Sequence, residues 1–274
     1  MDIENLLDPV RKIATEAGAV IMDVYRQPFE VDEKSDGSPV TLADRRAHDV
    51  IARGLADLTP DLPLLSEESA PGAAVGRRGW RRFWLVDPLD GTREFVNRNG
   101  EFTVNIALIE DGVAVLGVVH TPARGLTHAA ARGAGAERSE AGRTAPVRCR
   151  PFNPRAVCLV ASRSHAGAAV AAYRENLERE VGRVDSTSMG SALKIRLVAE
   201  GAADIYPRLG PTSEWDTAAS HAVLTEAGGR LTDVHGRELE YNKESLLNPW
   251  FLAIGDPSHD WLRYLPPDAF ADPG

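Results

Sequence analysis

The sequence predicts an α+β protein in which sheets and helices form layers around one site. Two observations lead to this class: the first half contains a β-hairpin pattern after two amphipathic helices, and the second half alternates strand and helix patterns. Such elements stack in layers because each sheet face and each helix stripe buries its apolar side against another element. With 274 residues, 43% of them apolar, the chain is long enough for a substantial core.

Two helices are predicted at the start of the chain. Apolar residues recur at helical spacing over residues 3–26, which predicts an amphipathic helix. A second helix is expected to begin at Thr41 or Asp44 and to end before Pro60.

Strands are predicted next, and a turn joins the two longest. Asp111-Gly112 is a strong hairpin signal because both residues tolerate the turn's backbone conformation. The expected strands lie in LPLLSEES, in RRFWLVD and in the two arms of FTVNIALIEDGVAVLGVVHTP.

The second half of the chain alternates strand and helix patterns. Gly201 and the Gly-Gly pair after the last helix are typical helix ends. In chain order we expect a strand in AVCLVASRS, a helix over Ala166–Glu180, a helix in GSALKIRLVAEG, a strand in ADIYPRL, a helix in SEWDTAASHAVLTEAGG, and strands in RLTDV and WFLAIGD.

Composition limits the class of protein. A net charge of −9 argues against a nucleic-acid groove, which needs a basic footprint. The two cysteines, Cys149 and Cys158, have no CxxC spacing, which favours a reducing cytoplasm. The acidic N-terminus lacks the pattern of a signal peptide, and the apolar runs are too short to span a bilayer.

The stretch WLVDPLDGTREF places Asp87 and Asp90 at the end of an apolar run. An ordinary reading is a strand-to-helix turn in which Asp90 caps the helix and Pro88 stiffens the bend. The alternative is a metal site at a helix entrance, with the amides of Gly91 and Thr92 facing a phosphate. Two carboxylates this close repel each other, and a divalent cation removes that cost.

Three further acids lie where apolar structure stops: Asp44, Glu67 and Asp216. Each has an ordinary explanation, either as an acid in the first turn of a helix or as a solvated loop charge. Acids in all four stretches together favour a single site over four coincidences.

The segments SPVTLAD, LLSEES, WLVDPLDGTREF and WDTAASHAVLTEAGG resemble, in order, the four signatures of the inositol monophosphatase superfamily of lithium-sensitive, metal-dependent phosphatases. The resemblance covers about residues 5–255. It implies an α-β-α-β-α sandwich with Mg²⁺ bound in a central cleft. We interpret the chain as one catalytic unit with a metal-site lobe at about residues 1–135, a substrate lobe at about 136–274, and a seam within Arg132–Arg150.

The resemblance also implies a ligand set for two or three Mg²⁺ ions. Glu67, Asp87 and the carbonyl of Leu89 would hold one ion, and Asp87, Asp90 and Asp216 would hold a second. An all-oxygen set suits Mg²⁺. The seven histidines show no metal-ligand spacing, which argues against zinc.

The implied chemistry is hydrolysis of a phosphate monoester by water. Asp44 and Thr92 would orient that water, and Glu67 would act as both metal ligand and proton acceptor. No covalent intermediate is needed. The reacting phosphate would lie against Asp90, Gly91, Thr92 and Asp216.

Within the superfamily, RNGEFTVNIALI, ASRSH and SMGSALKIRLVAEGAADIYPRLGPTSEWD look most like the CysQ-type 3′(2′),5′-bisphosphate nucleotidases. Their substrate is adenosine 3′,5′-bisphosphate, a small molecule left over from sulfate assimilation. Retaining a 5′-phosphate requires a second anion site, for which Lys194, Arg208 and Ser191 are candidates. Ser162 and His165 would lie towards the nucleoside. The ordinary alternatives are that Lys194 is a solvated helix residue, that Arg208 forms a salt bridge at the rim, and that His165 is a capping or surface residue.

Other functions stay open on the residues alone. An inositol or sugar monophosphatase of the same superfamily would use the same metals. A haloacid dehalogenase-type phosphatase needs DxDGT, whereas DPLDGT has one residue more between the acids. A non-catalytic phosphometabolite-binding protein is a further class, although Asp44, Glu67 and Thr92 are all acceptable catalytic residue types. The GxGxxG, GxxxxGK[ST], HExxH and GxSxG motifs are absent.

Overall fold

The computed structural model describes residues 2–33, 39–70, 72, 74–162 and 167–270. The helices are α1 (Leu7–Tyr25), α2 (Leu42–Leu58), α3 (Thr92–Val96), α4 (Ala168–Val181), α5 (Leu193–Ala199) and α6 (Glu214–Glu226). The strands are β1 (Val31–Glu33), β2 (Pro39–Thr41), β3 (Leu64–Ser66), β4 (Arg82–Asp90), β5 (Thr103–Glu110), β6 (Val113–Thr121), β7 (Leu126–Ala131), β8 (Gly135–Glu140), β9 (Arg143–Val147), β10 (Val157–Ser162), β11 (Val184–Met189), β12 (Ile205–Arg208), β13 (Arg230–Asp233) and β14 (Phe251–Ile254).

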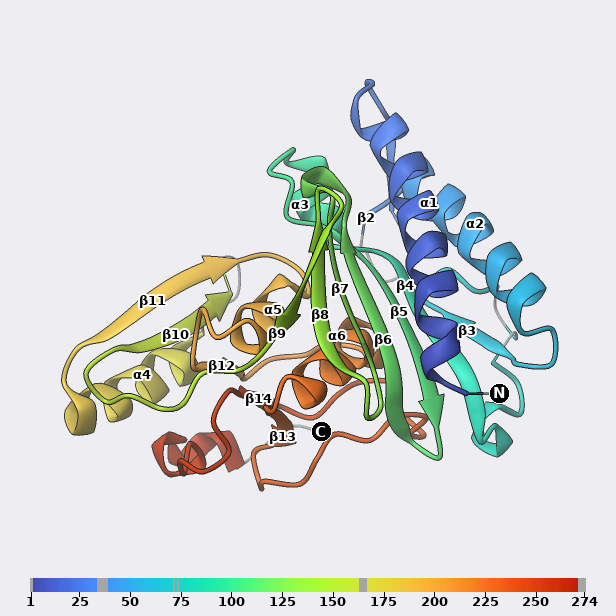
Figure 1. Cartoon of the computed structure of the whole chain (residues 1–274). Helices are drawn as coiled ribbons and strands as arrows, with labels where there is room; N and C mark the ends of the chain where they lie inside the picture. The colour runs from blue at the N-terminus through green and yellow to red at the C-terminus, as the bar shows by residue number, and fades with distance from the viewer. Residues whose placement is uncertain (1, 34–38, 71, 73, 163–166, 271–274) are drawn as a thin grey trace.

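The seven-stranded sheet has the order β3-β4-β5-β6-β7-β8-β9 and is antiparallel except for the β3/β4 pair. Helices α1 and α2 lie side by side over one of its faces (Figure 1). The predicted apolar stripe of α1, from Val10 to Val24, is buried against the sheet together with Ile51 and Leu55 of α2. Both predicted helices and the hairpin at Asp111-Gly112 are therefore confirmed.

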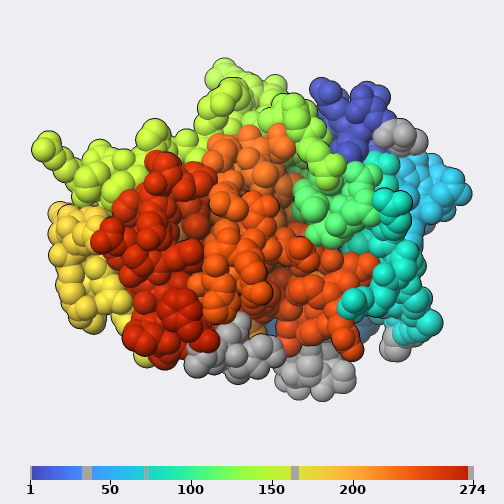
Figure 2. Space-filling model, turned by 90° about the horizontal axis from the view of Figure 1, so that it is seen from below, coloured from blue at the N-terminus to red at the C-terminus, as the bar shows by residue number. Residues whose placement is uncertain are grey.

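The five-stranded sheet has the order β11-β10-β12-β14-β13 and mixes parallel and antiparallel pairs. Helix α4 contacts β10, β11 and β12, while α5 contacts β10, β12 and β14. Seen from below, the part of the chain around α6 (orange) lies between the first half of the chain (cyan and green) on one side and the segments around α4 (yellow) and β14 (red) on the other (Figure 2).

Helices α5 and α6 form the layer between the two sheets (Figure 1). Gly117 of β6 permits this close packing, because a Cβ there would lie 2.1 Å from the carbonyl oxygen of Ala219 in α6. The order of layers is thus helices, sheet, helices, sheet, helix, and the predicted α-β-α-β-α fold is confirmed.

Residues 132–150, interpreted above as the seam between two lobes, contain β8 and β9, which complete the seven-stranded sheet. Strands β7 and β11, which the pattern did not predict, lie in the seven- and five-stranded sheets. In the described part of the chain no helix has the length and apolarity needed to cross a membrane.

Candidate active site

A β-bulge in β4 turns Asp87 and Asp90 to the same face of the sheet. Asp87 pairs with Asn105 and Asp90 pairs with Thr103, so three steps along β4 oppose two steps along β5. Residues three apart in a regular strand point to opposite faces, and one extra residue removes that difference. Pro88 lies within the bulge, where its missing N–H costs no ladder hydrogen bond.

The chain turns from strand β4 into helix α3 here, as the ordinary reading expected, but Asp90 is the last residue of β4 and does not cap the helix, so that part of the reading is wrong. The N-cap of α3 is Gly91, and no side chain caps this helix. Gly91 has φ 90°, and a Cβ there would lie 3.0 Å from the carbonyl oxygen of Glu101, so both conformation and space favour glycine.

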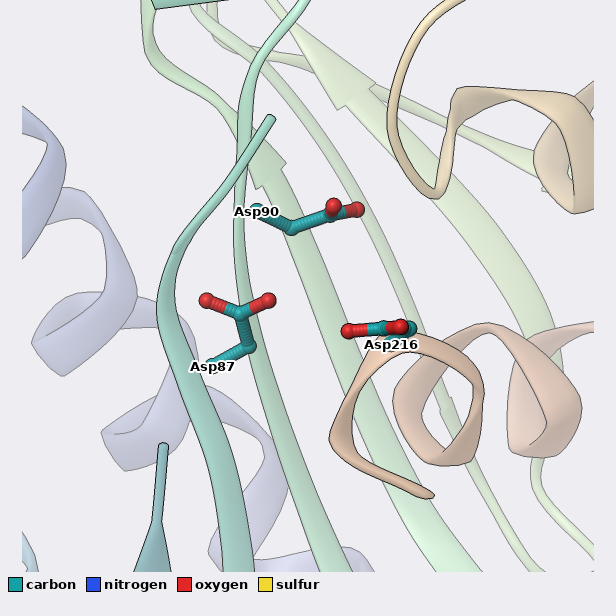
Figure 3. A group of neighbouring side chains, drawn as sticks. All are labelled: Asp87, Asp90 and Asp216. Atoms are coloured by element: carbon teal, nitrogen blue, oxygen red, sulfur yellow. The ribbon is translucent and has the colours of Figure 1, made fainter. Parts of the chain in front are cut away.

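Asp87, Asp90 and Asp216 form a compact acidic triad. Carboxylate oxygens of the three lie within 4.8 Å of one another. Figure 3 shows the side chains converging on one space, two from β4 and one from the first turn of α6. Among the described residues, none of the three forms an ion pair with a Lys, Arg or His side chain.

The charge of the triad is costly without a cation. Burial, followed by the charges of neighbouring acids, raises the pKa of Asp87 well above its ordinary value, and the pKa of Asp216 is raised by the same two causes. Three converging, mutually repelling oxygen ligands are what a hard divalent cation would stabilise. The residues present therefore fit a metal ion.

Asp44 and Asp216 occupy equivalent positions in two capping boxes. Each is the third residue of its helix and accepts the backbone N–H of the N-cap residue, Thr41 for α2 and Ser213 for α6, both at 2.8 Å. The ordinary interpretation, that these acids belong to the first turn of a helix, is thus correct. It does not exclude a second role for them in the site. The cap fixes one carboxylate oxygen and leaves the second to the site.

The second oxygen of Asp44 meets Thr92. The Thr92 hydroxyl lies 3.2 Å from Asp44 Oδ1 and 3.3 Å from the carbonyl oxygen of Leu89, and can donate its single proton to one of them. Burial raises the pKa of Asp44, a shift that the hydrogen bonds from Thr41 oppose. The structure thus joins the pair that the resemblance assigned to water orientation.

Glu67 lies directly after β3, and its backbone N–H donates to the carbonyl of Val86 at 3.1 Å. Its charge contributes to the raised pKa of Asp87, so the two acids are neighbours, but Glu67 lies outside the compact triad. Ser66, the residue before it, is 3.0 Å from His48 Nδ1, which ties the end of β3 to α2.

One pocket collects most of the predicted substrate residues. Its lining includes Asp90, Gly91, Ser191, Lys194, Arg208 and Asp216. Ser162 ends β10 but its side chain is outside the description, and His165 lies outside the described residues.

The basic wall of this pocket is formed by Lys194 and Arg208. Lys194 is 8% exposed, donates to the carbonyl of Ser191 at 2.6 Å, and lies 5.6 Å from the ring centroid of Tyr206. Burial lowers its pKa to about 8. Arg208 donates to the carbonyl of Pro211, and its Nε is buried without an acceptor. Neither cation pairs with a carboxylate in the described part of the chain, so an anion would satisfy both.

Sequence reasoning named Ser191 only as a candidate for the second anion site, and it missed the other residues that fix Asp90. Its Oδ2 accepts the hydroxyl of Ser191 at 2.6 Å and the backbone N–H of Ala192 at 2.5 Å. Thr103 and Asn105 approach the same oxygen from β5 at 3.5 and 3.4 Å. The sequence did contain a signal for these two residues. Thr103 and Asn105 are polar residues two positions apart, and they therefore lie on the same face of an otherwise apolar strand.

Comparison with known proteins agrees with this geometry. Residues 2–252 match the model of the inositol monophosphatase family. The chain is 51% identical over 249 residues to the 3′(2′),5′-bisphosphate nucleotidase CysQ of Escherichia coli strain K12, covering 90% of this chain and 98% of the relative. It is 36% identical over 262 residues to CysQ of Haemophilus influenzae, covering 94% and 96%.

Solved structures give the same result. CysQ from Bacteroides thetaiotaomicron, described as a bacterial member of the inositol monophosphatase family, is 41% identical with a TM-score of 0.82 and covers 92% of this chain and 97% of its own. An inositol monophosphatase from Anabaena is 27% identical with a TM-score of 0.77 and covers 97% and 98%. The chain belongs to the inositol monophosphatase family.

Proposed function

We propose that the protein is a Mg²⁺-dependent 3′(2′),5′-bisphosphate nucleotidase that removes the 3′-phosphate of adenosine 3′,5′-bisphosphate to give AMP and phosphate. The observation that carries the proposal is the presence, in one pocket, of an acidic wall at Asp90 and Asp216 and a basic wall at Lys194 and Arg208. A substrate with one reacting and one retained phosphate needs both walls. The relatives named CysQ nucleotidases support it.

The acidic wall would hold two or three Mg²⁺ ions. Glu67, Asp87 and the Leu89 carbonyl are proposed for one ion, and Asp87, Asp90 and Asp216 for a second. Bound Mg²⁺ would supply positive charge that neutralises the phosphoryl oxygens and acidifies the attacking water.

Asp44 and Thr92 position that water in the proposed mechanism. Asp44 is fixed by the N-cap of α2 and can accept a hydrogen bond from the Thr92 hydroxyl. The Thr92 oxygen can then accept a hydrogen bond from the water. Glu67 takes up the water's proton. Gly91 and Thr92, at the start of α3, face the reacting phosphate.

The basic wall would bind the phosphate that does not react. Lys194 has two further ammonium hydrogens to donate, and Arg208 Nε is an unused donor. Ser191 belongs to this subsite by position, and Ser162 and His165 are proposed to lie towards the nucleoside.

We further propose a cytoplasmic enzyme that clears this nucleotide during sulfate assimilation. Both cysteines are free, which agrees with a reducing compartment.

Phosphate release from a substrate panel tests the proposal. We expect adenosine 3′,5′-bisphosphate to be hydrolysed with a higher kcat/KM than inositol 1-phosphate or fructose 1,6-bisphosphate in the presence of Mg²⁺. Preference for inositol 1-phosphate would assign the chain to the inositol phosphatases of the same family. Binding without turnover of any panel member would support a non-catalytic phosphometabolite-binding protein.

A further inference from the structure

Glu94 is a pocket-wall carboxylate to which the mechanism above gives no role. It lies on α3, one helical turn beyond Gly91, and lines the same pocket as Asp90 and Lys194. The charges of both residues act on it, and it is half-buried. It is therefore close to the proposed reaction site.

The backbone around Glu94 leaves room for its side chain. A Cβ at Gly190 would lie 2.6 Å from Glu94 Cγ and 3.1 Å from Oε1, and a Cβ at Gly91 would lie 3.5 Å from Oε2. The carboxylate thus lies beside two lining residues of the pocket that carry no side chain. Its position is defined by packing.

Glu94 differs from its acidic neighbours in its hydrogen bonds. Asp90 accepts from Ser191 and Ala192, and Asp216 accepts from Ser213. Among the described residues, no other residue donates a hydrogen bond to the Glu94 carboxylate. Its oxygens can therefore accept hydrogen bonds from a ligand in the pocket.

We propose that Glu94 accepts a hydrogen bond from the sugar hydroxyl vicinal to the reacting phosphate, and so selects ribonucleotide over 2′-deoxyribonucleotide bisphosphates. The inference rests on the proposed nucleotidase function. A carboxylate repels phosphate and favours a neutral donor. With the reacting phosphate at Asp90, Gly91 and Thr92, the vicinal hydroxyl is the closest neutral donor of the substrate, whereas the adenine amino group is separated from that phosphate by the whole sugar.

The test compares kcat/KM for adenosine 3′,5′-bisphosphate and 2′-deoxyadenosine 3′,5′-bisphosphate. A hydrogen bond to a charged acceptor corresponds to a preference of about ten- to hundredfold for the ribonucleotide in the parent protein. In Glu94→Ala the ratio should fall close to one, with hydrolysis of the deoxy substrate nearly unchanged. Glu94→Gln, which keeps the shape and one accepting oxygen, should give an intermediate ratio and decides the question if the alanine variant folds poorly.

Asn97→Ala is the matched control, because Asn97 is an exposed residue at the end of the same short helix. It should leave both rates and their ratio unchanged. A parent ratio near one, or a ratio that survives in Glu94→Ala, would overturn the inference while leaving the nucleotidase function intact. Absence of phosphate release from both substrates by the parent protein would refute the nucleotidase function and the inference with it.

Discussion

Two acids on the first turn of α6 have opposite surroundings. Glu214 is fully buried and accepts the backbone N–H groups of Asn242 and Lys243 as well as Lys243 Nζ at 2.6 Å. Asp216 accepts one backbone N–H and faces Asp87 and Asp90. A compensated buried charge destabilises the fold when its partner is removed, whereas an uncompensated charge is already retained at a cost and indicates a ligand.

The cations of α5 and its surroundings show the same difference. Arg196 donates to Glu200 at 2.6 Å, and Glu200 lies 2.7 Å from His128 Nε2, which ties α5 to β7. Lys194, two residues earlier on the same helix, donates only to the carbonyl of Ser191 among the described residues. The uncompensated Asp216 and Lys194 line one pocket, whereas the compensated Glu214 and Arg196 lie outside its lining.

Removing the cation should have the largest effect. We expect exhaustive chelation to reduce phosphate release to background, with recovery on adding Mg²⁺. Ca²⁺ should not restore it, because its longer and looser coordination spoils the alignment of attacking and leaving oxygens. Li⁺ is expected to inhibit, by family resemblance alone. Full turnover after chelation would mean that the triad is not a metal site.

Asp216→Asn should lower kcat/KM by about a thousandfold or more, because it removes a charge that is proposed to bind the metal. In chelator its thermal stability should not fall, since carboxylate repulsion is relieved. The control is Glu214→Gln on the same turn, which breaks a compensated pair and should lower the free energy of unfolding by roughly 1–3 kcal/mol. Equal destabilisation of the two variants, measured by denaturant unfolding in chelator, would remove the distinction between these acids.

Thr92→Ala should reduce kcat by about a hundredfold, the lower range of general acid–base effects, since the proposed role of Thr92 is to orient the attacking water. The affinity for Mg²⁺, measured by calorimetry, should be nearly unchanged. A large loss of metal affinity would instead make Thr92 part of the ligand shell.

Arg208→Ala should lower kcat/KM for adenosine 3′,5′-bisphosphate by about ten- to hundredfold, because a charged contact to the retained phosphate is lost. Hydrolysis of adenosine 3′-monophosphate, which lacks that phosphate, should change little. Equal losses on both substrates would contradict a 5′-phosphate subsite on the basic wall.

Local sequence pattern was sufficient for the first two helices and for one hairpin. α1, α2 and the β5–β6 hairpin were predictable because their apolar periodicity and their caps are properties of short segments. β9 and β11 were missed because they are edge strands with mostly exposed or polar residues. These two strands form because their backbones pair with a neighbouring strand, and this pairing requires little hydrophobic pattern in the sequence.

The sequence by itself determined the residue types of the site and its two capping boxes, since an acid three residues after Thr41 or Ser213 is a local signal. Only the tertiary structure decided that these acids meet. Asp87 and Asp90 share a face because β5 pairs with β4 across a bulge, and spacing alone would have set them on opposite faces.

Asp216 joins Asp87 and Asp90 because α6 packs between the two sheets, against Gly117. Lys194 and Arg208 reach the same pocket from α5 and the end of β12. Convergence of groups far apart in the chain depends on packing between layers, and packing depends on the shape and volume of every buried side chain together. The spacing of residues in the sequence contains no information about the packing between layers or about the shape and volume of the buried side chains.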